Sequence, residues 1–188
     1  MARIALLDAS VLGPAPLRDF LLRLAHAGVV RVRWSNGILD ECFRSLVAGR
    51  LDLSAAALTP TRQALNAAFP SALVERYEEL LPTIQLRDDA ECGVLAAAIH
   101  ASAAVIVTFR IERFPPSIVA RYGVDAIHPD DFVLEQIADG ISPVRAALVG
   151  QARGLRGPPM TPLEVLSRLE VCGLPRSVAR LRGALGEG

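Results

Sequence analysis

The chain has 188 residues, of which 52% are hydrophobic and 5% aromatic, and its twenty acidic and twenty basic side chains balance. This length and composition are typical of one sizeable folded core and exclude a disordered chain. The balanced charge argues against a protein that binds nucleic acid through bulk charge alone, although a local basic patch is compatible with it.

The compartment is indicated by the cysteines and by the apolar runs. Three scattered cysteines (Cys42, Cys92 and Cys172) have no metal-ligand spacing and indicate reduced thiols in a cytoplasmic protein. The first ten residues, MARIALLDAS, carry one arginine and a very short apolar run, so we expect no signal peptide. No apolar run reaches the ~18 residues that a membrane-spanning helix needs, so we expect no membrane association.

Apolar spacing predicts strands that alternate with helices over the first two thirds of the chain. The predicted elements are, in chain order, a strand at 3–8, a helix at 16–28, a strand at 29–35, a helix at 35–49, two helices within 54–80, a helix at 90–102, a strand at 103–109, a short helix at 116–123 and a strand at 124–129. Such alternation indicates an α/β fold, with a mostly parallel sheet flanked by helices.

From about residue 129 onward the pattern is helical only. A Gly/Pro-rich linker precedes a helix that Thr161 should cap, with Pro162 at its first position. We therefore predict a domain at 1–139 and a helical C-terminal extension at 140–188 that packs on it.

Acidic residues stand where a parallel sheet forms its sites, beyond the carboxyl ends of the strands. Asp8 ends the first predicted strand, Glu41 lies on the helix at 35–49, and Asp88, Asp89 and Glu91 surround the start of the helix at 90–102. If Asp8, Glu41 and Glu91 converge, their mutual repulsion favours a bound cation such as Mg²⁺ or Mn²⁺. Alternatively, the acids at 88–91 are ordinary helix-start residues and Glu41 is a solvated side chain.

Three stretches resemble the PIN-domain family, in particular the branch related to VapC-type toxins. They are IALLDASVLGPAPLRDFLLRLA, RWSNGILDE and VLAAAIHASAAVIVTFRIERFP with YGVDAIHPDDF, and the likeness extends into PPMTPLEVLSRLEVCGLPR. The resemblance implies a parallel sheet, a rim of four acidic positions, and Mg²⁺- or Mn²⁺-dependent cleavage of RNA. It also implies a cognate antitoxin and a homodimer. Residues 16–48 would contribute to the dimer, or alternatively their apolar positions all belong to the core of one chain.

The resemblance assigns the acidic positions one by one. Asp8, Glu41 and Glu91 would be the catalytic and metal-binding acids, with Asp88 as a further metal ligand. The fourth region departs from the family, because its usual TFNLKDFP is TFRIERFP here. Arg110 and Arg113 thus stand at an asparagine and an aspartate position, while Thr108 is retained. These three residues would contact the substrate.

Two hypotheses follow from this departure. The chain is either a metal-dependent endoribonuclease that grips phosphate with its two arginines, or a catalytically impaired PIN-fold module that binds RNA or protein. A guanidinium cannot ligate Mg²⁺, but it can balance part of the charge of the carboxylates. Calorimetry with Mn²⁺, followed by an RNA cleavage assay with Asp8→Asn as the control, distinguishes the two hypotheses.

Overall fold

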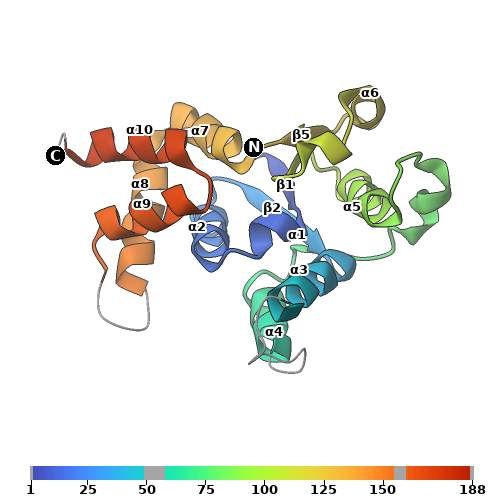
Figure 1. Cartoon of the computed structure of the whole chain (residues 1–188), viewed down its shortest axis with the longest axis horizontal. Helices are drawn as coiled ribbons and strands as arrows, with labels where there is room; N and C mark the ends of the chain where they lie inside the picture. The colour runs from blue at the N-terminus through green and yellow to red at the C-terminus, as the bar shows by residue number, and fades with distance from the viewer. Residues whose placement is uncertain (1, 49–57, 155–159, 187–188) are drawn as a thin grey trace. The chain divides into compact units, whose positions relative to one another are not determined.

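The computed structural model describes residues 2–48, 58–154 and 160–186 (Figure 1). They form two compact units. The sheet unit consists of residues 3–13 and 31–127, and the helical unit consists of residues 14–30 and 128–188 together with the N-terminus. Each unit is described by itself.

The sheet unit is built on five parallel strands in the order β3-β2-β1-β4-β5. The strands are β1 (Ile4–Leu7), β2 (Arg31–Ser35), β3 (Leu73–Val74), β4 (Val105–Val107) and β5 (Asp125–Ile127). This arrangement confirms the predicted α/β class with a parallel sheet.

The register of the two central strands brings their carboxyl ends to the same edge. Leu7 of β1 pairs with Val107 of β4, and all side chains of β4 are buried, as short apolar runs in parallel sheets usually are. The residues that follow, Asp8 and Thr108, therefore leave the sheet at one edge, which is where parallel sheets form their sites.

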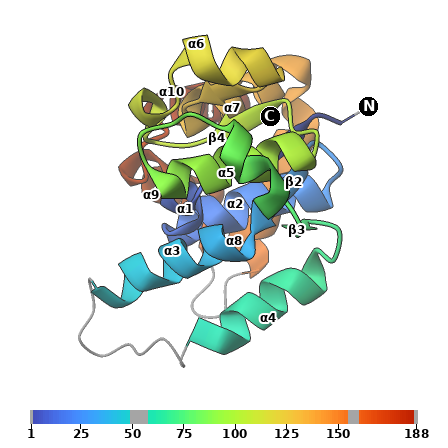
Figure 2. The same cartoon turned by 90° about the vertical axis from the view of Figure 1, so that its right-hand side faces the viewer.

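Helices complete the unit. They are α1 (Ala9–Leu12), α3 (Asn36–Ala48), α4 (Thr59–Ala68), α5 (Asp89–His100) and α6 (Pro116–Val119), with 3₁₀ helices η2 (Glu78–Thr83), η3 (Ile111–Arg113) and η4 (Ala120–Tyr122). Helix α5 lies against β1, β2 and β4 and beside α3 (Figure 2). Ser35 caps α3, because its hydroxyl accepts a hydrogen bond from the Ile38 N–H at 3.2 Å.

The prediction of two helices within 54–80 is wrong in its second half. Residues 54–57 lie outside the described residues, and α4 is the helix that follows them. Beyond it the chain forms the edge strand β3 and then η2, with Pro82 inside the latter. Arg76 separates the two with a left-handed φ of 58°, a conformation that ends regular structure and is uncommon outside glycine.

The helical unit consists of α2 (Ala15–His26), α7 (Pro129–Asp139), α8 (Ile141–Gly154), α9 (Pro162–Val171) and α10 (Pro175–Gly186). Helix α2 lies against α8, and the Gln151 side-chain amide donates to the Pro16 carbonyl at 2.9 Å. Thr161 caps α9 as predicted, in a capping box with Glu164. The division of the chain at residues 139 and 140 stays a prediction.

Four apolar side chains of α2 are buried within the chain. Leu17, Phe20, Leu21 and Leu24 are all fully buried, so they do not provide the free surface on which the homodimer was expected. The homodimer itself stays a prediction. None of the described helices is both long enough and apolar enough to cross a bilayer.

Candidate active site: a carboxylate cluster around Arg110

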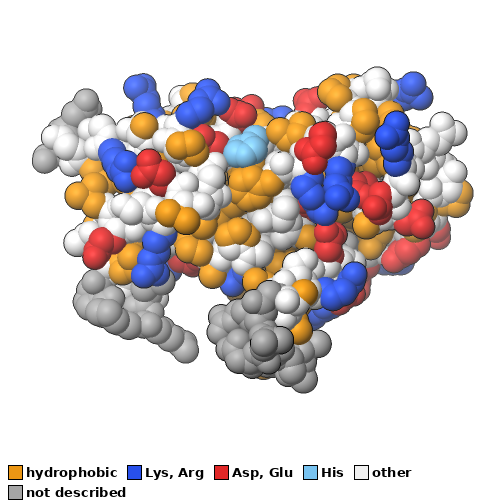
Figure 3. Space-filling view, in the orientation of Figure 1, with side chains coloured by type: hydrophobic (Ala, Val, Ile, Leu, Met, Phe, Trp, Pro, Cys, Tyr) orange, Lys and Arg blue, Asp and Glu red, His pale blue; other side chains and the backbone are white. Residues whose placement is uncertain are grey.

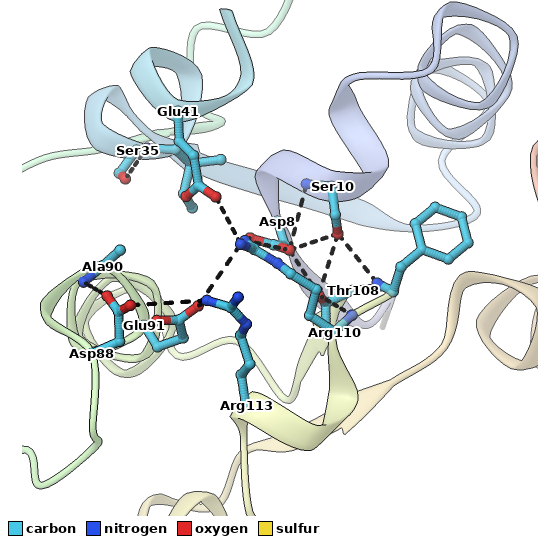
Figure 4. A network of polar contacts seen from close by, with 12 residues as sticks. Asp8, Ser10, Ser35, Glu41, Asp88, Ala90, Glu91, Thr108, Arg110 and Arg113 are labelled. Carbon is cyan, nitrogen blue, oxygen red and sulfur yellow. Dashed lines mark hydrogen bonds and ion pairs between the residues drawn. The ribbon is translucent and has the colours of Figure 1, made fainter. Parts of the chain in front are cut away.

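Asp8 is the most enclosed acid of the site, with 0% of its surface exposed. Its main chain ties β1 to β4, because the Asp8 N–H donates to the Val107 carbonyl at 3.1 Å. Its carboxylate accepts hydrogen bonds from the Ser10 hydroxyl at 2.6 Å and the Thr108 hydroxyl at 2.7 Å (Figure 4). Two hydroxyl groups thus hold this carboxylate at the carboxyl edge of the sheet.

The guanidinium of Arg110 lies between the carboxylates of the cluster (Figure 4). Its Nη2 is 3.0 and 3.1 Å from the two Asp8 oxygens, and its Nη1 is 2.8 Å from Glu41 Oε1 and 3.8 Å from Glu91 Oε1. Burial alone would lower the pKa of Arg110, but Asp8 and Glu41 outweigh it and raise that pKa. Arg110 is therefore held as a cation.

The three acids reach Arg110 from three segments of the sheet unit. Asp8 follows β1, Glu41 lies on α3, and Glu91 lies in the first turn of α5. Glu91 is 2% exposed, whereas the Glu41 side chain is 25% exposed. The three carboxylates thus lie together, and Glu41 is the one that solvent reaches most easily.

Arg113 adds a second cation at the side of Glu91. Its Nη1 is 2.8 Å from Glu91 Oε1 and 3.9 Å from Asp88 Oδ2, and the hydrogen bond with Glu91 raises the pKa of Arg113. Asp88 caps α5 by accepting from the Ala90 N–H at 2.8 Å, which lowers the pKa of Asp88. Asp88 therefore has the helix-start role that the sequence left open, while it also faces the cluster.

A pocket of about 450 Å³ opens beside the cluster. Its walls include Glu41, Glu91, Arg110 and Arg113. A second pocket of about 1030 Å³ shares Asp88, Glu91 and Arg113 with the first. Arg113 therefore lines both pockets. Neither pocket is lined by more basic than acidic side chains.

A divalent metal ion does not fit into this arrangement. Mg²⁺ requires near-octahedral oxygens at about 2.0–2.1 Å, but the Arg110 guanidinium fills the space between Asp8 and Glu41. Within residues 2–48, 58–154 and 160–186, no three acidic, histidine or cysteine side chains are arranged to hold a metal. Two buried atoms, Glu91 Oε2 and Arg110 Nε, have no hydrogen-bond partner among these residues, so the arginines satisfy the cluster incompletely.

The predicted site residues have different surroundings in the structure. Arg110 and Arg113 both turn toward the acids. The Thr108 hydroxyl faces Asp8 rather than a pocket, and Thr108 is fully buried.

Two residues of the site were not predicted. Ser10 was missed, although a hydroxyl two residues after a strand-end acid is a recognised turn signal. Tyr77, which lines the first pocket, was also missed, because it belongs to the segment whose structure was predicted wrongly.

The fold and the site place the protein among α/β proteins that have a parallel sheet and a cluster of acidic side chains at its carboxyl edge. Comparison of the sequence with family models gives the family. Residues 5–111 match the PIN domain model, and residues 129–183 match the model of the VapC50 C-terminal domain. The chain belongs to the PIN domain family, which confirms the resemblance inferred from its motifs.

A curated relative agrees with this assignment. The chain is 38% identical over 76 residues to the "Putative ribonuclease VapC50" of Mycobacterium tuberculosis (strain ATCC 25618 / H37Rv). The match covers 40% of this chain and 45% of the relative, so it spans less than half of either protein. No solved structure gave a significant match to the chain.

Proposed function

We propose that the protein is an endoribonuclease of the VapC toxin type. The observation that carries the proposal is the convergence of Asp8, Glu41 and Glu91 at the carboxyl edge of a PIN-domain sheet. The relative named as a ribonuclease supports RNA as the substrate. On the face shown in Figure 3, acidic and basic side chains are interspersed, so the described residues of this face offer RNA particular arginines rather than a broad basic surface.

The proposed reaction is hydrolysis of an RNA phosphodiester. A water oxygen attacks the phosphorus atom, and a proton of this water passes to a carboxylate. The bond to the leaving oxygen breaks, and that oxygen takes up a proton from solvent and departs as a hydroxyl group. Glu41 suits the role of the proton acceptor, because it is the most exposed of the three acids and lines the pocket. Arg113, whose side chain is 45% exposed, suits the contact with a phosphate oxygen.

Metal dependence is part of the proposal under one condition. PIN-type nucleases of the VapC group generally use divalent metal ions. Mg²⁺ or Mn²⁺ is the ion that a cluster of carboxylate oxygens would select. With Arg110 between Asp8 and Glu41 there is no place for the ion, so we include it only for a state in which Arg110 has left the cluster.

A second function is favoured by the position of Arg110. A cluster whose charge is already balanced by arginines suits a catalytically impaired PIN-fold module that binds RNA or a protein partner. The two functions differ in one measurable respect, because only the first breaks RNA. Both include a cytoplasmic location as an expectation.

Cleavage of single-stranded RNA by the full chain tests the proposal. We expect the unmodified protein to cleave an end-labelled RNA and Asp8→Asn to lose the activity. Asp125→Asn is the matched control, because Asp125 is exposed on β5 and is not part of the cluster. Cleavage that persists in Asp8→Asn would come from another source and would contradict the proposal, while RNA binding without cleavage would favour the impaired module.

Two partners complete the proposal. A cognate antitoxin is expected for a protein of the VapC type, and a small open reading frame for it beside the gene would support the toxin function. A homodimer is also proposed, and sedimentation would distinguish it from the 20.1 kDa monomer. Because Leu17, Phe20, Leu21 and Leu24 of α2 are buried within the chain, the dimer would use other residues of 16–48 or another surface.

A further inference from the structure

Arg110 makes the contacts that a bound cation would make. One guanidinium joins three acidic side chains that come from the end of β1, from α3 and from α5, and one of its nitrogens lies within 3.1 Å of both Asp8 oxygens. A surface arginine usually pairs with one exposed acid and contributes little. Here two of the three partners, Asp8 and Glu91, are enclosed, and the arginine lies at the centre of the cluster.

The charge of Arg110 is needed where it lies. Asp8 is fully buried and Glu91 is almost so, and carboxylates enclosed close to one another repel unless a cation lies between them. Asp8 has two hydroxyl donors, which supply hydrogen bonds but no positive charge. Arg110 and Arg113 supply that charge within the chain itself.

The loop that carries Arg110 is fixed by the hydroxyls that hold Asp8. The Arg110 N–H donates to the Thr108 hydroxyl at 3.0 Å, and the Phe109 N–H donates to the Ser10 hydroxyl at 3.2 Å. The same two hydroxyls donate to Asp8. The side chain of Arg110 therefore starts from a backbone position that is set by the site, and its guanidinium is held inward by the carboxylates of Asp8 and Glu41.

Two buried polar atoms show that the guanidinium does not satisfy the cluster completely. Glu91 Oε2 is buried without a hydrogen-bond partner among the described residues, although Glu91 lines both pockets beside the cluster. Arg110 Nε is buried and unpartnered in the same way. A planar guanidinium offers its donors in fixed directions, so it cannot satisfy oxygens that are arranged around one point.

We infer that Arg110 is a built-in counter-cation that occupies the place of a divalent ion, so that the unmodified protein keeps such ions out of its acidic cluster. The inference concerns this chain's own residues and holds whether or not the protein cleaves RNA. It has two consequences. The fold of the sheet unit needs no metal ion, and removal of Arg110 leaves a cluster that requires one.

Calorimetry with MnCl₂ on the full chain tests the inference. We expect saturable binding by Arg110→Asn, with an affinity at least about tenfold higher than any that the unmodified protein shows. Arg121→Asn removes one exposed arginine from the same unit and should behave as the unmodified protein does. Asp8→Asn combined with Arg110→Asn should lose the gained binding, which would assign it to the cluster.

Thermal melting gives a readout that does not depend on catalysis. Arg110→Asn should melt at a lower temperature than the unmodified protein in EDTA and recover several degrees when Mn²⁺ is added, since a ligand that binds only the folded state stabilises it. The unmodified protein should melt at one temperature in both solutions. Tight Mn²⁺ binding by the unmodified protein would overturn the inference, and that result is readable even if the variant fails to fold.

Discussion

Replacing Thr108 by valine should destabilise the sheet unit more than the loss of one hydroxyl usually does. Valine has nearly the shape of threonine, so the change removes hydrogen bonds without leaving a cavity. The Thr108 hydroxyl donates to Asp8 at 2.7 Å and accepts from the Arg110 N–H at 3.0 Å, and Thr108 is fully buried. One substitution therefore weakens the hold on both the acid and the arginine of the cluster.

The size of the effect follows from these two hydrogen bonds. A hydrogen bond to a charged group is worth about 1.5–3 kcal/mol, and a buried N–H left unpaired costs about 1–3 kcal/mol. The extra methyl group of valine offsets about 0.8 kcal/mol, and Asp8 keeps its bonds to Ser10 and Arg110. We expect a net loss of about 2–4 kcal/mol, which lowers the melting temperature by about 5–15 °C in a chain of this size.

The fluorescence of Trp34 is a suitable assay for this loss. It is the single tryptophan of the chain, it is fully buried on β2, and its indole donates to Asn66 at 2.9 Å, so it reports on the sheet unit. Thr83→Val is the matched control, because the exposed Thr83 hydroxyl donates only to the Leu80 carbonyl. If both variants melt within about 2 °C of the unmodified protein, a difference below about 1 kcal/mol, the hydroxyl of Thr108 does not support the cluster.

Two further predictions concern the helical unit. Asp130 accepts hydrogen bonds from the first N–H groups of α10, at Arg176 and Ser177, so Asp130→Ala should cost about 1–3 kcal/mol and expose α10 to proteolysis. Asp139, which is exposed at the end of α7, is its control, and equal proteolysis of both alanine variants would contradict the capping role. Truncation after Gly140 removes the helix against which α2 packs and should lower solubility and the melting temperature. An unchanged melting temperature would contradict this packing.

Much of the fold could be predicted because its central elements are strongly patterned. The runs at 3–8 and 103–109 are short, apolar and bounded, and they form the two central strands. The segment after α4 could not be predicted, because β3 has only two residues and is defined by its pairing with β2 rather than by its own pattern. The left-handed backbone of Arg76 is likewise set by tertiary structure.

The candidate site was predictable in its acids and less so in its arginines. Asp8 directly follows an apolar strand, and this position alone assigns it to the carboxyl edge of the sheet. The direction of Arg110 depends on where three distant segments bring their carboxylates, and no local pattern encodes that. The role of Ser10 could not be predicted for the same reason. Its hydroxyl also accepts a hydrogen bond from the N–H of Phe109, which lies 99 residues further along the chain.

The central claim is that Arg110 occupies the cation position of an acidic centre for RNA cleavage and thereby slows the reaction. It is tested most directly by the rate at which Arg110→Asn cleaves single-stranded RNA in Mn²⁺, compared with the unmodified protein. The account predicts a rate about tenfold higher or more, since the cluster regains an open cation position. A lower rate would mean that Arg110 serves to grip RNA, and an unchanged rate would mean that it does neither; each of these results would contradict the account.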